Sequence, residues 1–127
     1  MILLDSSVLI ELFRTKDKSK TFFFQLSADE NEFAISALTH YEIFIGNNET
    51  QTDFWNSFLT FIKIIPFDLP CSLEAVKIYE DLRKKNQMIG LADLVIAATA
   101  IANNLPIATN NFKHFARIEN LIIINKR

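Results

Sequence analysis

The stretch MILLDSSVLIELFR, residues 1–14, places a short apolar run directly before a helical pattern. Residues 1–4 are apolar and stop at Asp5, which indicates a short buried strand that ends at a charged residue. Residues 7–14 repeat apolar side chains at a spacing that suits a helix, namely Val8, Ile10, Leu12 and Phe13. The stretch therefore predicts a strand, a turn and a helix, with Asp5 at the carboxyl end of the strand.

The same alternation of strands and helices continues along the whole chain. Further strands are expected at residues 33–36, 63–66, 106–108 and 121–124. Further helices are expected at residues 16–28, 37–45, 50–61, 72–85 and 91–103, with Ser72 as the N-cap of the fourth. This order predicts an α/β fold: a central, mostly parallel, twisted sheet of about five strands with helices on both faces.

Length and composition fit one domain that spans residues 1–127. Hydrophobic residues make up 50% of the chain, whereas apolar runs such as residues 121–124 are too short to cross a bilayer, so no membrane segment is expected. Cys71 is the only cysteine, which excludes an intrachain disulfide and favours a cytoplasmic protein. The net charge of −2 provides no global attraction for nucleic acid, so any such contact must be local.

Polar residues follow the expected strands at the edge of the sheet where α/β proteins bind ligands. Asp5 ends the first strand, Glu42 lies on the helix after the second, and Asp93 opens the alanine-rich helix. Residues 109–111, Thr-Asn-Asn, follow the strand at 106–108. Carboxylate and amide oxygens suit Mg²⁺ or Mn²⁺, and such an ion supports phosphodiester hydrolysis. The sequence therefore predicts a metal site at this edge.

Each of these residues also has a purely structural interpretation. Asp5 could cap the first helix, and Asp93 could interact with a helix dipole. Glu42 could lie on a solvated helix face, and the asparagines at 110 and 111 could be ordinary turn residues. The expectation that all of them meet at one sheet edge favours the functional interpretation.

Four segments, in order, also resemble the motifs of PIN-domain ribonucleases of the VapC toxin type. They are LLDSSVLIELF at 3–13, LTHYEIFIG at 38–46, IGLADLVIAATA at 89–100 and IATNNFKHFARIENLIII at 107–124. The resemblance covers the whole chain. It implies a PIN fold, an endoribonuclease that depends on Mg²⁺ or Mn²⁺, and inhibition by a cognate antitoxin.

The resemblance also assigns roles to individual residues. Asp5, Glu42 and Asp93 match the acidic metal-site positions of the family, and Ser6 matches a supporting hydroxyl. Thr109 and Asn111 match a late T-x-N or T-x-D element, so Asn111 joins the catalytic candidates. Where some members have a fourth aspartate this chain has Asn111, and a neutral amide holds a second cation less strongly.

Weaker predictions concern contacts with RNA and with a protein partner. RNA phosphate could be contacted by Lys113, His114 and Arg117, although these residues could equally form a solvated polar turn. The segments 16–28 and 50–61 carry more phenylalanine than a small monomer should expose, which favours a homodimer or an antitoxin complex.

Other functions remain as alternatives. A catalytically silent PIN-like module would bind RNA or a protein without cleaving anything. A phosphatase of the haloacid dehalogenase type also begins with a strand that ends in Asp, but its second Asp would fall at Ser7. A receiver domain needs an acidic pair at its first strand and a later lysine, and neither stands at a suitable place.

Overall fold

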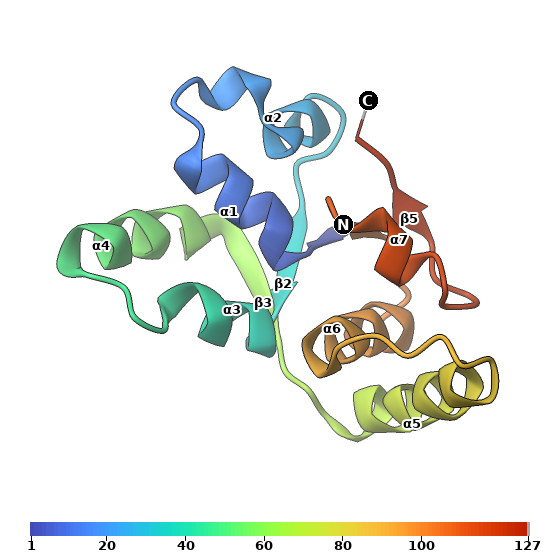
Figure 1. Cartoon of the computed structure of the whole chain (residues 1–127). Helices are drawn as coiled ribbons and strands as arrows, with labels where there is room; N and C mark the ends of the chain where they lie inside the picture. Colours follow the sequence, from blue (N-terminus) through green and yellow to red (C-terminus); the bar gives the residue numbers. More distant parts are fainter. Residues whose placement is uncertain (127) are drawn as a thin grey trace.

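A computed structural model describes residues 1–126 of the chain (Figure 1). Within this range the structure has one sheet of five strands, ordered β3-β2-β1-β4-β5, and every neighbouring pair is parallel. The strands are β1 (Ile2–Leu4), β2 (Phe33–Ser36), β3 (Ile62–Ile65), β4 (Ile107–Ala108) and β5 (Ile123–Ile124). The predicted α/β class and the five-stranded parallel sheet are confirmed.

Helices cover both faces of this sheet (Figure 1). The α-helices are α1 (Ser6–Arg14), α2 (Phe22–Ser27), α3 (Ala37–Phe44), α4 (Glu49–Phe58), α5 (Leu69–Lys84), α6 (Leu91–Ala102) and α7 (Phe112–Phe115). Two single-turn 3₁₀ helices, η1 (Lys18–Lys20) and η2 (Leu59–Phe61), extend the connections. All helices within residues 1–126 are too short or too polar to span a lipid bilayer.

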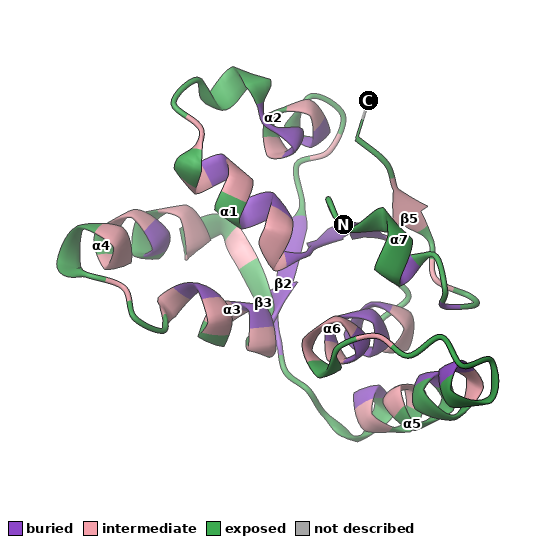
Figure 2. Ribbon diagram, viewed as in Figure 1, coloured by how far each residue is buried: buried purple, intermediate pink, exposed green. Residues whose placement is uncertain are grey.

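The central strand β1 divides the hydrophobic residues into two cores. Leu3 packs with residues of α5, α6 and α7, whereas Ile2 and Leu4 pack with residues of α1, α2 and α4. This division follows from the strand geometry, since successive side chains point to opposite faces of a sheet. Figure 2 shows the buried strands β1 and β2 between the two groups of helices. All three side chains of β1 are buried, which explains why its sequence is uniformly apolar.

The start of α5 differs from the sequence-based expectation. The prediction of a helix from residue 72 with Ser72 as its N-cap is wrong, because α5 begins at Leu69 and Asp68 is the N-cap. The Asp68 carboxylate accepts a hydrogen bond from the backbone N–H of Cys71 at 3.3 Å. Pro70 lies in the first turn, where a proline leaves no helical hydrogen bond unmade.

The expected helix at 16–28 is also wrong, because this segment divides into η1 and α2. Asp17 accepts from the backbone N–H of Ser19, and Thr21 accepts from that of Phe24. Each cap starts a new helix, so a continuous helix cannot form. The helix expected at 50–61 likewise ends at residue 58 and continues as η2, and the short helix α7 was not predicted.

A candidate active site where the strand order reverses

The candidate site lies between β1 and β4, the two strands at the middle of the sheet. From β1 the chain proceeds to β2 and β3 on one side, and later to β4 and β5 on the other. Such a switch point opens a crevice at the carboxyl ends of the strands. Asp5 follows β1 and Thr109 follows β4, and the backbone N–H of Asp5 donates to the carbonyl of Ala108 at 3.0 Å. Parallel pairing therefore places two of the predicted residues side by side.

Asp5 is held by two hydroxyl groups. Its side chain is buried, and Oδ2 accepts hydrogen bonds from Ser7 Oγ at 2.7 Å and Thr109 Oγ1 at 2.8 Å. Each hydroxyl also accepts a hydrogen bond from the backbone. The N–H of Asn110 donates to Ser7 Oγ at 3.0 Å, and the N–H of Asn111 donates to Thr109 Oγ1 at 2.9 Å. The network fixes one carboxylate oxygen and ties the loops after β1 and β4 together. The other oxygen, Oδ1, is buried and has no hydrogen-bond partner within residues 1–126.

Burial raises the pKa of Asp5 above its ordinary value. Burial is the largest cause because removal from water disfavours the charged form. The hydrogen bonds from Ser7 and Thr109 oppose this effect, and the negative charge of Asp93 adds to it. The metal-free site therefore holds a carboxylate whose charge is only partly compensated.

Glu42 enters the site from α3, which begins where the Ser36 hydroxyl caps the backbone N–H of Thr39 at 3.0 Å. Burial raises the pKa of Glu42, the charges of Asp5 and Asp93 raise it further, and the Ser6 hydroxyl opposes them by hydrogen bonding. Among the described residues, its Oε1 is another buried oxygen without a partner. The three predicted carboxylates therefore lie close enough for their charges to act on one another.

Asp93 lies in the first turn of α6 and contacts a histidine that the sequence did not connect with it. His114 Nδ1, on α7, is 2.9 Å from Asp93 Oδ2. The imidazole is half exposed, whereas the Asp93 side chain is largely covered. The contact with the Asp93 carboxylate therefore places His114 at the candidate site. Because α7 was not predicted, no sequence pattern indicated which face of that segment meets α6.

The remaining predicted residues are distributed around this centre. Asn111 is exposed at the N-cap position of α7, where its side chain makes no capping hydrogen bond. Lys113 is exposed on the same helix. Arg117 Nη1 donates to the carbonyl of Met88 at 3.0 Å, so this guanidinium is engaged with the connector before α6. Sequence analysis missed Ser7, which binds Asp5, and its signal is a hydroxyl two residues after the strand-ending aspartate.

The carboxylate oxygens of the site suit a hard divalent cation. Asp5 Oδ1 and Glu42 Oε1 are buried acceptors that lack a donor within the described part of the chain, and Mg²⁺-like ions prefer such oxygens. No three His, Cys, Asp or Glu side chains among residues 1–126 are arranged to hold an ion by themselves. Mg²⁺-like ions are usually bound through one or two carboxylates and completed by water and substrate phosphate.

Comparisons with known proteins agree with this arrangement. The family model of the PIN domain matches residues 2–121. Ribonuclease VapC2 of Rickettsia felis is 32% identical over 97% of this chain and 96% of its own length. Ribonuclease VapC1 of Methanocaldococcus jannaschii is 37% identical over 93% of this chain and 81% of its own length. The chain therefore belongs to the PIN-domain family, within its VapC group.

A solved structure extends the comparison to three dimensions. The crystal structure of VapBC2 from Rickettsia felis bound to a DNA fragment from their promoter contains a chain that is 31% identical to this one. The alignment covers 98% of both chains with a TM-score of 0.86. The expected PIN fold is thus confirmed over nearly the whole chain.

Proposed function

We propose that this protein is a divalent-metal-dependent endoribonuclease that acts as a toxin and is neutralised by a cognate antitoxin. The observation that carries the proposal is the buried Asp5 carboxylate at the switch point of the sheet, with one unpartnered oxygen and with Glu42 and Asp93 within electrostatic reach. Its relatives are named ribonucleases, and the neighbouring solved structure is a VapBC complex. We propose RNA as its substrate and the cytoplasm as its location.

The residues divide the work as follows. Asp5, Glu42 and Asp93 would bind the cation, Mg²⁺ or Mn²⁺, one or two of them directly and the rest through water, and Ser7 and Thr109 fix the orientation of Asp5. When bound, such an ion lowers the pKa of a water molecule and stabilises negative charge on the scissile phosphate. Ser6 orients Glu42, and the contact with His114 orients Asp93, as hydrogen-bonded partners of metal ligands generally do.

RNA is bound by local groups, since the chain has a net charge of −2. Lys113 is exposed on α7, next to the histidine that contacts Asp93, and we assign it to an RNA phosphate. His114 contacts Asp93, so any contact of its imidazole with RNA is made from that position. Arg117 is a weaker candidate for binding RNA phosphate, because its guanidinium already donates to the carbonyl of Met88. Asn111 offers a neutral amide, which disfavours tight binding of a second cation at that position.

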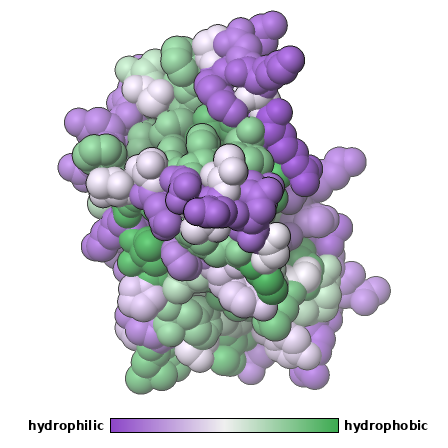
Figure 3. Space-filling model, turned by 90° about the vertical axis from the view of Figure 1, so that its left-hand side faces the viewer, coloured by the Kyte–Doolittle hydropathy of each residue, from purple (hydrophilic) through white to green (hydrophobic). Residues whose placement is uncertain are grey.

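An apolar groove between α2 and α4 supports a protein partner. It is lined by Leu12, Lys18, Phe23, Phe24, Ser27, Phe54 and Phe58. Phe23 and Phe54 pack against Phe58, so much of the predicted phenylalanine-rich face is internal, whereas 52% of Phe24 is exposed. Figure 3 shows apolar side chains on the α4 side of the molecule, interrupted by polar groups. We propose that an antitoxin or a second copy of the chain covers this groove.

Replacement of two carboxylates of the site tests the catalytic proposal. In Mn²⁺, Asp5→Asn and Asp93→Asn should each reduce RNA cleavage at least about a hundredfold, because each removes a metal-binding charge with little change in volume. Asp53→Asn, an exposed aspartate on α4, is the matched control and should keep wild-type activity. Circular dichroism checks the fold of each variant.

The outcome also separates the enzyme from the catalytically silent module. Mn²⁺-dependent products from the wild type and none from the two site variants support the enzyme. RNA binding without any product over a full Mn²⁺ titration would support the silent module. Wild-type activity in either site variant would exclude the assigned site.

A further inference from the structure

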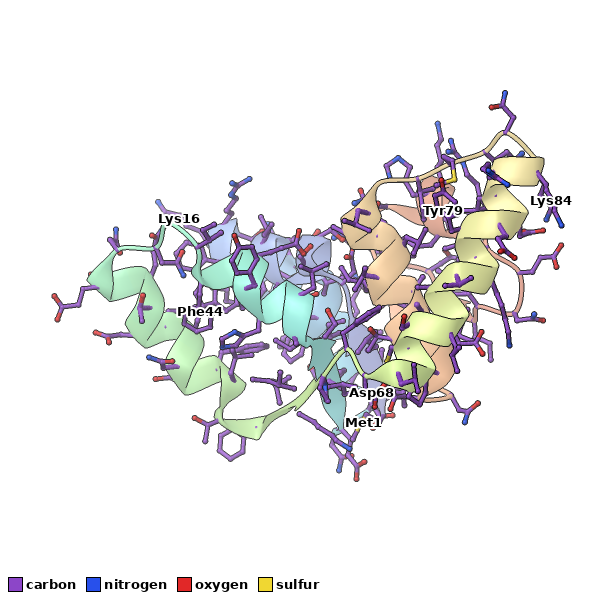
Figure 4. The ribbon with its side chains drawn as sticks, turned by 90° about the horizontal axis from the view of Figure 1, so that it is seen from below. Met1, Lys16, Phe44, Asp68, Tyr79 and Lys84 are labelled. Carbon is purple, nitrogen blue, oxygen red and sulfur yellow. The ribbon has the colours of Figure 1, made fainter. Side chains whose placement is uncertain are left out.

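A hollow of about 150 Å³ lies beside Glu42, between α1, α3 and α4. We call it the Glu42 pocket. Figure 4 shows these three helices together on one side of the sheet, away from α5 and α6. Its apolar wall includes Phe13 and Trp55, whose ring centroids are 5.6 Å apart, and Ile45 lies at its rim with 60% of its surface exposed. The pocket is therefore a separate hollow that shares one carboxylate with the candidate active site.

Polar groups with free hydrogen-bonding capacity also line the pocket. The exposed Arg14 guanidinium has no ion pair or hydrogen bond within residues 1–126. The amide nitrogen of Asn47 donates to the carbonyl of Ile43, and the amide oxygen of Gln51 accepts a hydrogen bond from the backbone N–H of Asn48 at 2.9 Å. Each amide therefore keeps its other end for a ligand.

Apolar walls together with a few hydrogen-bonding edges are the features that bind an unstacked nucleobase. The shared carboxylate limits the position of such a base, because any occupant of the pocket lies next to a group of the cleavage site. The cation at Arg14 suits the adjoining phosphate. In contrast, the groove between α2 and α4 is almost wholly apolar, which suits a protein partner better.

We propose that the Glu42 pocket binds one nucleobase of single-stranded RNA beside the scissile phosphate and thereby sets the sequence preference of cleavage. The inference rests on the proposed ribonuclease function. Arg14 holds the neighbouring phosphate, the amides of Asn47 and Gln51 read the edge of the base, and Phe13 forms part of the wall against which it packs.

Two variants with matched controls test the pocket. Arg14→Ala removes its cation, and Lys16→Ala removes an exposed cation just beyond α1 (Figure 4). Ile45→Trp fills the pocket, and Ile64→Trp adds the same ring at an exposed position on β3. A pool of random-sequence RNA is digested in Mn²⁺, and the new 5′ ends are sequenced. The same pool is also selected for binding in EDTA, which needs no cleavage.

The wild type should enrich one base at a fixed position next to the cut, and both pocket variants should lose that enrichment while both controls keep it. On the preferred oligonucleotide, the pocket variants should raise KM about tenfold and change kcat less than about threefold.

Three results would overturn the inference. The first is unchanged base preference in both pocket variants, and the second is a wild type that enriches no base in cleavage or in binding. The third is a pair of pocket variants that only weaken binding of the antitoxin. If the wild type cleaves nothing but still selects a base through the pocket in EDTA, the pocket stands and the proposed ribonuclease function falls.

Discussion

Replacing Asp5 with asparagine should stabilise the metal-free protein. Removing the buried charge relieves a desolvation penalty of several kcal/mol. Against this gain, Ser7 and Thr109 each donate to the carboxylate. A hydrogen bond to a charged group contributes about 1 kcal/mol more than a neutral one, so the amide loses about 2 kcal/mol over the two bonds. The raised pKa of Asp5 shows that burial outweighs these bonds. We expect a net gain of about 1 kcal/mol, or about 3–5 °C in Tm.

The sign of the pH dependence follows from the same carboxyl group. Its folded-state pKa lies above the ordinary value of 3.8, so the folded protein binds this proton more tightly than the unfolded chain does. The contribution of Asp5 to the free energy of unfolding of the metal-free wild type should therefore fall as pH rises from 3.8 through the folded-state pKa of Asp5. Asp5→Asn should lack that contribution.

Thermal melts in EDTA and in saturating Mn²⁺ measure both effects. The variant should melt higher than the wild type in EDTA. The wild type should gain more from Mn²⁺, about 2.7 kcal/mol at a hundredfold excess over Kd. Asp53→Asn, the exposed control, should change neither melt. The reasoning is refuted if Asp5→Asn melts lower in EDTA and gains as much from Mn²⁺ as the wild type.

Three further predictions concern the caps, the hydroxyl network and the partner surface. Asp68→Ala should lower the free energy of unfolding by about 1 kcal/mol in urea denaturation, whereas Ser72→Ala should leave it nearly unchanged; the reverse order would return the start of α5 to residue 72. Ser7→Ala should cost about 1–2 kcal/mol and weaken Mn²⁺ binding in calorimetry, and unchanged Mn²⁺ affinity would show that Ser7 does not orient Asp5. Phe24→Glu should weaken antitoxin binding or dimerisation in light scattering and leave RNA cleavage intact, while unaltered assembly would exclude the groove between α2 and α4.

The juxtaposition of the acidic residues could be predicted from the sequence because it depends on topology. The carboxyl ends of parallel strands meet at one edge, so Asp5 and Thr109 were expected at the same edge, and the pairing of β1 with β4 makes them neighbours. The position of Glu42 followed in the same way from the strand before α3. These arguments need only the order of the elements and no detail of side-chain packing.

Other contacts depend on competition between local alternatives that a linear pattern does not resolve. Asp68 and Ser72 are both suitable helix caps, and Pro70 in the first turn favours the earlier start. The contact between His114 and Asp93 joins residues 21 positions apart and depends on the orientation of a four-residue helix. Ser6 and Ser7 both follow the aspartate, and only the geometry of the turn assigns the second of them to Asp5.

The pairing of β1 with β4 has a consequence for the synthesis of the protein. Leu3 aligns with Ile107, and the hydroxyl of Thr109 completes the hydrogen bonds of Asp5, so the first and the late parts of the chain build one site. A nascent chain emerges from its N-terminus, so Asp5 lacks the hydrogen bond of Thr109 while about a hundred further residues are added at roughly 5–20 per second. The candidate site therefore cannot be complete until residues 107–111 have been made, some seconds after the aspartate itself.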